Sequence, residues 1–362
     1  MRRSPLVIAA VLAAVVIVGV VLARRASHRT AVVTTGPGGG TSLGGPTAPG
    51  DLVIRMLDVG QGDATLITNG GSVALVDGGP DQNALGARLD ALGLGHDTTI
   101  DVVVLSHAHA DHYMGLRELF ASRRRLKVRY VFENRDASTN RTLATLRDSI
   151  IARARRGELT YRDSDDPCGD GRPVCTITMR GGARLEVVRP DPSSKDPNDR
   201  STAVKIVAAD SSRFTMWLAG DAEREELAWF DQVGYPTQPG MRADVLKADH
   251  HGSCNGVTAH YLAEVHPRRV LVSVGAENDY GHMHEQAKAA YRAAGVPWYR
   301  TDRNGTITVR VPAAGGAFTV TPEHPGESLD GQSDRASTSG ECRSMTGDEA
   351  PNAQRPRRRR RP

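Results

Sequence analysis

Four potential metal ligands lie in the short stretch SHAHADH: His107, His109, Asp111 and His112. They directly follow the apolar run 100–105, which predicts a strand buried on both faces. Imidazole and carboxylate groups without a thiolate suit Zn, Mn or Fe. Alternate residues of a loop can point the same way, so His107 and His109 can serve one ion while Asp111 and His112 serve a second. This spacing indicates a metal site rather than ordinary surface histidines.

Carboxylates elsewhere in the chain could complete this site. Asp77 ends a predicted strand before two glycines, so it could orient the metal ligands or simply form a turn. Asp63, like Gln61, lies between glycines after the first strand and could line the site or cap a hairpin. Asp221 follows the apolar run 216–219 and precedes a predicted helix, where an Asp can also act as an N-cap.

A second group of candidates surrounds the motif DHHGS at 249–253. Side chains alternate along an extended chain, so only one of His250 and His251 can easily face a given metal. We favour His251 as the ligand and His250 as a proton donor or substrate contact, and the reverse assignment stays open. His282 is the alternative to His251 as the last metal ligand. Lys247 could contact a phosphate or only lie at a strand edge.

Predicted strands and helices are mixed along the chain. The strands lie at 51–57, 64–68, 73–76, 100–105, 128–132, 184–188, 203–207, 214–218, 245–247, 269–274 and 306–311. The helices lie at 83–92, 113–122, 143–155, 223–230, 259–264 and 285–294. This mixture favours an α/β sandwich over a simple doubly wound sheet. The only Gly-rich stretch of interest, GPGGG, lacks a strand–turn–helix context, so no nucleotide cofactor is expected.

Charge is distributed unevenly. The 362-residue chain has a net charge of +4, yet residues 36–322 hold 33 basic and 35 acidic side chains. The body is therefore near neutral, which excludes a wholly basic nucleic-acid-binding domain. Basic patches inside the body lie at 123–125 and 153–156, and a run of arginines ends the chain at 357–361.

The two ends differ from the body in composition. Residues 5–23 form an uncharged apolar run flanked by arginines, and such a helix spans roughly 30 Å, about one bilayer core. We expect a membrane anchor in 1–30, a Gly/Pro linker in 31–50, a folded domain in 51–322 and a disordered basic tail in 323–362. Arginine on both flanks leaves the orientation of the anchor ambiguous.

The roles of the four cysteines are less clearly indicated by the sequence than those of the histidines. Cys168 and Cys175 bracket a short loop and would form a disulfide in an exported protein, or be two unrelated thiols. Cys254 follows HHGS and is more readily a bystander than a metal ligand or an oxidation target. Cys342 lies in the polar tail.

The pattern H-x-H-x-D-H resembles the signature of the metallo-β-lactamase fold superfamily at every ligand position. Other motifs resemble, in family order, the C-terminal hydrolase domain of the ComEC/Rec2 competence DNA-uptake proteins: LDVGQGDATLI at 57–67, LVDGG at 75–79, PNDRSTAVKI at 197–206, FTMWLAGDAEREEL at 214–227, DVLKADHHGS at 244–253, LVSVGAENDYGH at 271–282 and YRTDRNGTITV at 299–309. The resemblance covers roughly 51–311 and implies a four-layer αββα sandwich. The multi-helix membrane channel of the full competence proteins is not found in this sequence.

The resemblance also implies a ligand set. It implies two divalent metal ions, Zn or Mn, bridged by Asp221. Four residues are expected to support the ligands: Asp77, Asp63, Asn198 and Ser253. The more familiar zinc hydrolases of the superfamily place a third histidine before the bridging aspartate, but no histidine occurs in 128–221. Asn198 and Ser201 stand near that place, and this thinner, harder ligand set favours Mn²⁺ or a single firmly bound ion.

These features predict an enzyme, a metal-dependent phosphodiesterase or nuclease that uses a metal-bound hydroxide. Asp111, His250 and Lys247 are its expected catalytic residues, and DNA or another phosphodiester polymer is its expected partner. The expected location is the cell membrane, with a single span and the catalytic domain outside. Two alternatives stay open. One is a cell-envelope phosphoesterase acting on teichoic acid or phosphocholine groups, and the other is a non-catalytic, metal-dependent module that holds nucleic acid or wall polymer.

Overall fold

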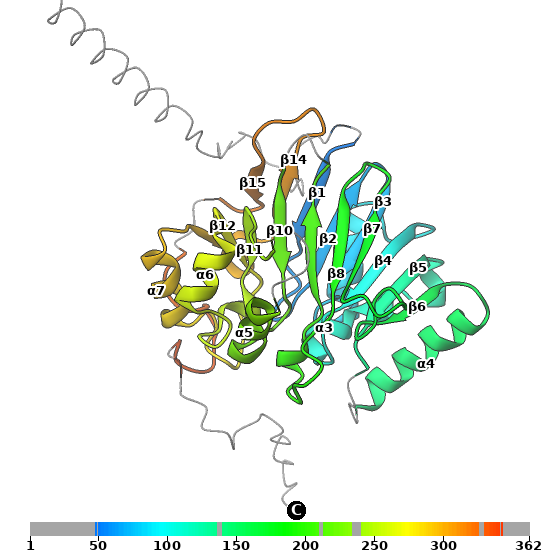
Figure 1. Ribbon diagram of the computed structural model, residues 1–362, viewed down its shortest axis with the longest axis horizontal. Coiled ribbons are helices and arrows are strands. Elements are labelled where there is room, and N and C mark those ends of the chain that lie inside the picture. The colour runs from blue at the N-terminus through cyan, green and yellow to red at the C-terminus, as the bar shows by residue number, and fades with distance from the viewer. Residues whose placement is uncertain are drawn as a thin grey trace, which may run out of the picture.

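The computed structural model describes residues 48, 50–135, 140–209, 213–233, 240–325, 329–340 and 342. Two mixed β-sheets face each other, and helices lie on their outer sides (Figure 1). The expected anchor at 1–30 lies outside the described residues, as does nearly all of the expected linker. Within the described ranges, no helix is both long and apolar enough to cross a bilayer.

The first sheet has eight strands in the order β15-β14-β1-β2-β3-β4-β5-β6. Their bounds are β1 Leu52–Met56, β2 Thr65–Asn69, β3 Ser72–Val76, β4 Thr99–Leu105, β5 Lys127–Glu133, β6 Thr160–Asp163, β14 Ile307–Val311 and β15 Thr319–Pro322. The strands from β3 to β6 are parallel, so the carboxyl ends of β3 and β4 lie at the same edge of the sheet.

The second sheet has seven strands in the order β13-β12-β11-β10-β9-β8-β7. Their bounds are β7 Val174–Thr178, β8 Arg184–Val188, β9 Ala203–Val207, β10 Thr215–Leu218, β11 Val245–Lys247, β12 Arg269–Val272 and β13 Trp298–Arg300. The strands from β10 to β13 are parallel. The loops after β10, β11 and β12 therefore also leave the sheet at one edge.

The helices are α2 Gln82–Ala91, α3 Ala110–Tyr113, α4 Arg141–Arg155, α5 Arg224–Gln232, α6 Ala259–Val265, α7 Glu285–Ala293 and α8 Thr301–Asn304. Three of them begin at a side-chain cap. Asp81 accepts hydrogen bonds from the first turn of α2, Asn140 from that of α4 and Thr258 from that of α6. Each cap satisfies backbone N–H groups that have no partner inside the helix.

The side chains of β4 show why its sequence is apolar throughout. Val102 and Val104 belong to the apolar cluster between the two sheets, whereas Val103 and Leu105 belong to the cluster beneath α2 and α4. A third cluster packs the second sheet against α5, α6 and α7. Burying one such side chain stabilises the fold by about 1.5–3 kcal/mol. The layers are thus helices, sheet, sheet and helices, as an αββα sandwich requires (Figure 1).

The helix expected at 113–122 is wrong. The chain makes only the short α3 and then a 3-10 turn at Gly115–Glu118. The N–H of Gly115 bonds to the carbonyl of Gly79, and a Cβ at Gly115 would lie 1.8 Å from the carbonyl oxygen of Gly78. The close approach of this glycine to the loop after β3 takes the place of a regular helix. The short strands β6, β7, β13 and β15 were not expected.

The disorder expected from residue 323 onward does not hold for 329–340 and 342, which we call the C-terminal strap. The guanidinium of Arg300 donates to the carbonyl of Gly331, and the N–H of Glu285 donates to that of Gly340. Cys342 forms a disulfide with Cys254. Composition missed the strap because its contacts come from backbone carbonyls and one cysteine rather than from apolar side chains.

Candidate metal centre

The candidate ligands gather where parallel strands of both sheets end. The loop with His107, His109, Asp111 and His112 follows β4. Asp77 follows β3, Asp221 follows β10 and His251 follows β11. Because both sheets direct the carboxyl ends of these strands to one edge of the sandwich, residues about 140 positions apart come into contact, such as Asp111 and His251.

Asp221 lies at the centre of the cluster. Its Oδ2 is 3.1 Å from Nε2 of His112 and 3.1 Å from Nε2 of His251. Nε2 of His251 is also 3.1 Å from Oδ2 of Asp111. These four residues each offer one ligand atom, and the atoms all lie within 4.8 Å of one another. Nε2 of His112 is buried without a hydrogen-bond partner, as expected of an atom reserved for a cation. The donor set therefore fits a divalent metal ion.

His107 and His109 approach the same carboxylate. Nε2 of His107 is 3.0 Å from Nδ1 of His109 and 3.9 Å from Oδ2 of Asp221. Burial lowers the pKa of His107 well below its usual value, and it lowers that of His109 as well. Both imidazoles are thus held neutral, the form that binds metal. With ligands on either side of Asp221, the cluster is consistent with a binuclear site.

The carboxylates and imidazoles of the cluster shift one another's pKa values. Burial raises the pKa of Asp111, but the nearby His112 and His251 outweigh it and hold that pKa at about 2. Burial lowers the pKa of His112, but Asp221 and Asp77 outweigh it and raise the value well above the usual range. The anionic carboxylates that raise this pKa also favour a bound cation.

Asp77 holds His112 in place. Its backbone has φ of 59°, in the left-handed region that Asp tolerates better than most residues. Its carboxylate accepts bonds from the N–H and the hydroxyl of Ser106, both at 2.8 Å, and lies 2.9 Å from Nδ1 of His112. If Nδ1 donates this bond, Nε2 is left as an acceptor that faces the cluster. Asp77 therefore lies beside His112 and away from solvent.

Lys247 does not occupy the position we expected. It is only 1% exposed, and its Nζ lies 2.5 Å from Asp63 and 3.5 Å from Asp221. It also donates to the carbonyl of Gly220. The amine is therefore enclosed by these two carboxylates and this carbonyl, away from solvent. A direct contact with a substrate phosphate is therefore wrong, and Lys247 instead positions Asp63 and Asp221.

His250 and His251 lie in a tight turn, Asp249–Gly252, and both have positive φ. Alternation along an extended strand therefore does not apply, yet the two rings do point to different groups. His251 faces the metal cluster, while Nδ1 of His250 is 2.8 Å from Oε1 of Glu223. The same Oε1 accepts a bond from Nδ2 of Asn198. Sequence reasoning missed Glu223, although its place two residues after Asp221 was a signal.

Two further candidates, His282 and Ser253, lie outside the four-residue cluster. His282 is buried, its ring centre is 6.0 Å from that of His251, and its Nδ1 has no hydrogen-bond partner. It stays a candidate ligand outside the four-residue cluster. Ser253 is buried, and its N–H donates to the carbonyl of His250. It thus supports the histidine turn rather than the metal cluster.

Both cysteine pairs form disulfides. Cys168 bonds to Cys175, as the sequence allowed, and Cys254 bonds to Cys342. The sulfur of Cys254 is therefore taken up by the disulfide in this structure. Its N–H donates to Nδ1 of His284, which ties the disulfide to the segment after His282.

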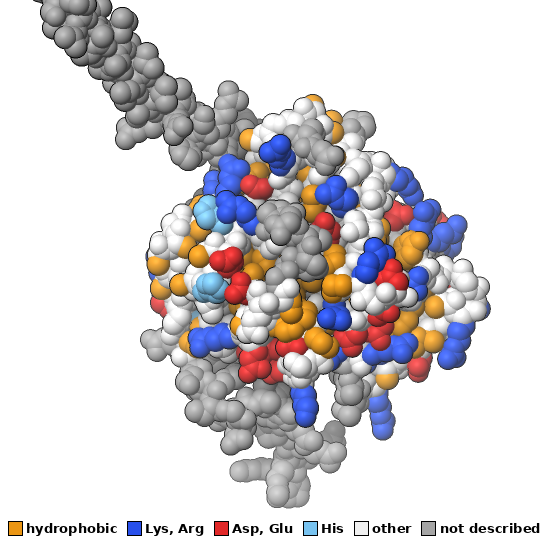
Figure 2. Space-filling model, viewed as in Figure 1, with side chains coloured by type: hydrophobic (Ala, Val, Ile, Leu, Met, Phe, Trp, Pro, Cys, Tyr) orange, Lys and Arg blue, Asp and Glu red, His pale blue; other side chains and the backbone are white. Residues whose placement is uncertain are grey.

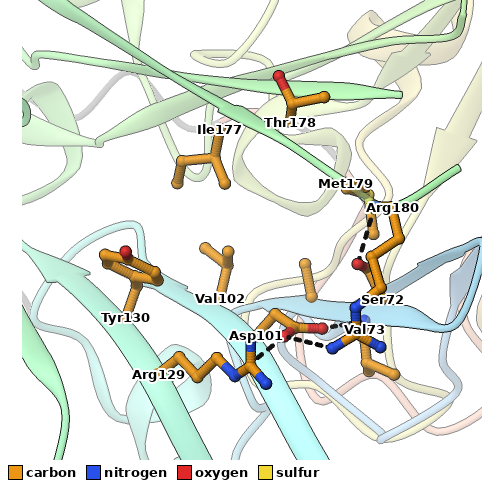
Figure 3. A pocket seen from close by; sticks show the side chains of 11 residues that line it. Ser72, Val73, Asp101, Val102, Arg129, Tyr130, Ile177, Thr178, Met179 and Arg180 are labelled. Carbon is orange, nitrogen blue, oxygen red and sulfur yellow. Dashed lines mark hydrogen bonds and ion pairs between the residues drawn. The ribbon is translucent and has the colours of Figure 1, made fainter. Parts of the chain in front are cut away.

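A small pocket lies at the opposite end of the strands (Figure 3). It has a volume of about 140 Å³ and opens between the two sheets near Asp101, at the start of β4. Arg129 and Arg180 each lie 3.4 Å from this carboxylate. The pocket is separated from the metal cluster by the length of β4, so it is not the reaction site.

Comparison with known proteins agrees with this site. The model of the family described as "Metallo-beta-lactamase superfamily" matches residues 57–189, which include the loop after β4. ComE operon protein 3 of Bacillus subtilis (strain 168) is 24% identical over 299 residues, 75% of this chain and 34% of that protein. Uncharacterized protein YcaI of Escherichia coli (strain K12) is 26% identical over 276 residues, 74% of this chain and 31% of that protein. The chain thus spans about a third of the length of these curated relatives.

Two solved structures show a weak likeness. The metallo-beta-lactamase fold protein YhfI from Bacillus subtilis has 15% identity and a TM-score of 0.46, with 72% of this chain and 99% of that chain covered. A diphosphatase from the PhnP family has 14% identity and a TM-score of 0.41, with 72% and 98% covered. The assignment rests instead on the sequence matches, the strand order and the buried ligands. Residues 57–189 of the chain match the metallo-beta-lactamase superfamily, a buried His/Asp cluster that could hold a metal lies at the site, and the chain is distantly homologous to ComE operon protein 3 and YcaI.

Proposed function

We propose that this hydrolase is a membrane-anchored phosphodiesterase that cleaves nucleic acid outside the cell. The observation that carries the proposal is the position of Asp221, whose carboxylate lies within 3.1 Å of imidazoles from both sheets. Bound there, divalent ions supply Lewis acidity and an activated water, a chemistry well suited to phosphodiesters. The resemblance of the motifs at 57–67 and 244–253 to the hydrolase domain of the ComEC/Rec2 DNA-uptake proteins supports nucleic acid as the substrate class.

Six residues of the chain are placed to hold the ions. His107, His109, Asp111, His112 and His251 would hold the ions together with Asp221. The side chain of Asp111 is 26% exposed, so the cluster reaches solvent on that side.

His250 is the group best placed to move a proton. Its side chain is 21% exposed, so it is close enough to solvent to meet a leaving group. Glu223 fixes the orientation of its ring, and Asn198 in turn fixes Glu223. Lys247 stays below the site and holds Asp63 and Asp221 in register.

The two disulfides support our proposal that the domain lies in an oxidising compartment. All four cysteines are paired among the described residues, and disulfides persist outside the reducing cytosol. An outward-facing domain is the orientation that agrees with them. It would follow the apolar segment at 5–23, which we propose anchors the chain.

The test is nucleotide release from linear DNA by the full chain in detergent, with Mn²⁺ or Zn²⁺ added. We expect release that depends on the metal, that Asp111→Ala abolishes and that Asp97→Ala leaves intact. Asp97 is a matched control because it is exposed and pairs with Arg125, away from the metal cluster. Cleavage of a generic phosphodiester without any release from DNA or RNA would reject the nuclease assignment.

A cell-envelope phosphoesterase is the second candidate, and the surface charge favours it. The arginines of the patch at 123–125 pair with Glu118, Asp90 and Asp97, and Arg156 pairs with Glu158. On the face shown in Figure 2, Lys and Arg are interspersed with Asp and Glu. Such a surface offers little of the free positive charge that attracts a polyanion. Release of phosphate or choline from isolated cell walls would favour this candidate.

A module that binds without turnover is the third candidate. Its motivation is the missing third histidine in 128–221. Turnover that Asp111→Ala abolishes would reject it, whereas metal-dependent retention of DNA or wall polymer without any product would support it.

A further inference from the structure

Tyr280 is an exposed aromatic side chain at the edge of the metal centre. Its ring stacks on that of His282, with ring centres 5.4 Å apart and an angle of 23° between the planes. His282 is 3% exposed, whereas Tyr280 is 48% exposed. One face of the tyrosine ring is thus covered by the histidine, and roughly half of the residue stays open to solvent. An aromatic ring that is half exposed among the described residues offers a planar ligand a flat surface for stacking.

The backbone around Tyr280 is fixed on both sides. Oδ1 of Asn278 accepts from the N–H groups of Tyr280 and His282, at 3.3 and 2.9 Å. The carbonyl of Tyr280 lies 3.1 Å from Nε2 of His284. The C-terminal strap adds a bond from Ser333 to the carbonyl of His282. The ring is therefore presented in one orientation before any ligand arrives, which reduces the entropy lost on binding.

Tyr280 also lies next to the metal cluster. The ring of His282, on which it stacks, has its centre 5.3 Å from that of His250 and 6.0 Å from that of His251. The exposed ring is therefore one imidazole away from two histidines of the site.

We propose that Tyr280 is a stacking platform for a nucleobase next to the scissile phosphodiester. The inference rests on the proposed phosphodiesterase function and narrows its substrate to a base-bearing strand. Stacking on an aromatic side chain tolerates any base, because every base has a π-face. A polyol phosphate of the cell wall has no flat ring to place there, so the same residue separates the two substrate classes.

The test uses the Mn²⁺-loaded full chain in detergent and two single strands of equal length, oligothymidylate and a fully abasic strand. A separate oligothymidylate strand carries one 2-aminopurine, and its fluorescence is read by stopped flow before turnover. Steady-state cleavage then gives KM and kcat for both strands. The variants are Tyr280→Ala, Tyr280→Leu, Tyr280→Phe and Tyr280→Trp.

We expect Tyr280→Ala and Tyr280→Leu to raise KM for oligothymidylate roughly tenfold, the effect of losing one stacked base. KM for the abasic strand and kcat should change little, and Tyr280→Phe and Tyr280→Trp should behave like the wild type. Tyr130→Ala is the matched control, because Tyr130 is 40% exposed beside the pocket at the far end of the strands. Quenching of 2-aminopurine should fall only in the Ala and Leu variants.

The outcomes separate this inference from the proposed function. Equal KM values of the wild-type protein for the two strands would overturn the stacking role and leave a phosphodiesterase. An equal loss on both strands in Tyr280→Ala would also overturn it, because a structural role does not depend on the bases. Cleavage of bis(p-nitrophenyl) phosphate but of neither strand would overturn both proposals. Because Phe retains the ring and lacks only the hydroxyl, a Tyr280→Phe variant as defective as Tyr280→Leu would assign the role to the hydroxyl and overturn stacking.

Discussion

The two sheets supply the metal cluster in different ways. The first sheet gives His107, His109, Asp111 and His112 from a single loop after β4. The second sheet gives Asp221 and His251 from the ends of two parallel strands, β10 and β11. The first set is arranged by local backbone geometry, whereas the second depends on how neighbouring strands pack. Asp221 belongs to the second set yet lies beside residues of the first, so it joins the two.

The supporting residues differ in the same manner. On the side of the first sheet, Asp77 reaches His112 across the adjacent strand end. On the side of the second sheet, a buried amine, Lys247, holds the carboxylates of Asp63 and Asp221. A ligand set drawn from separate strands brings several buried charges together, and a counter-charge beneath them offsets part of their repulsion. The second half of the site should therefore be the more sensitive to changes in buried charge.

The largest effect is expected from Asp221→Asn, because it removes the carboxylate that both halves share. Metal affinity should fall on the order of a thousandfold or more, beyond the 10–100-fold typical of a residue that only supports a ligand. Metal content after dialysis and calorimetric titration with Mn²⁺ would measure it. Asp231→Asn is the control, since Asp231 is an exposed residue of α5 that pairs with His260. Retained affinity in the Asp221 variant would show that the two halves bind metal independently.

Lys247→Met tests the buried counter-charge. Removing one partner of a buried ion pair costs about 3–5 kcal/mol, so the free energy of unfolding should fall by that amount in chemical denaturation. Lys127→Met, at an exposed position in β5, should change stability by less than about 0.5 kcal/mol. An unchanged stability combined with a raised KM would restore the role in phosphate binding that the structure argues against.

Cys342→Ser tests whether the disulfide to Cys254 holds the C-terminal strap against the part of the site contributed by the second sheet. Loss of the bond to Cys254 should lower the local stability of 329–340 by about 2–4 kcal/mol, seen as faster tryptic cleavage after Arg335. Cys175→Ser, which opens the other disulfide, should leave this cleavage unchanged. Equal cleavage in both variants would mean that hydrogen bonds alone hold the strap.

Asp77→Asn is expected to have the smallest of these effects. Asn keeps the left-handed backbone that this position requires but weakens the acceptor facing Nδ1 of His112. Metal affinity should fall by roughly 10–100-fold without a change of fold. Asp97→Asn is a matched control because Asp97 also has positive φ and is exposed. Affinity within twofold of the wild type would mean that the loop positions His112 unaided.

The same contrast explains what the sequence could predict. The metal-binding loop after β4 could be predicted because four ligands within six positions need no knowledge of the fold. The buried strand before it was readable because both of its faces are apolar, and the structure confirms it with one face toward each layer. The sandwich architecture came from the mixture of elements and the family motifs, and the two sheets agree with it.

The parts that failed depend on contacts distant in sequence. Lys247 was assigned to substrate because the sequence does not reveal that its amine meets the carboxylates of Asp63 and Asp221. Glu223 was missed because its partner, His250, comes from a turn after another strand. The C-terminal strap was missed because it is held partly by a disulfide to Cys254, and no local sequence pattern predicts such a bond.

The most direct test of the account is anomalous diffraction from crystals of the chain grown with Mn²⁺. We predict ions within coordination distance of Oδ2 of Asp221, one shared with His112 or His251 and one with His107 or His109. Ions bound elsewhere, for example beside His284, with none at Asp221, would contradict the assignment of this cluster as the metal centre.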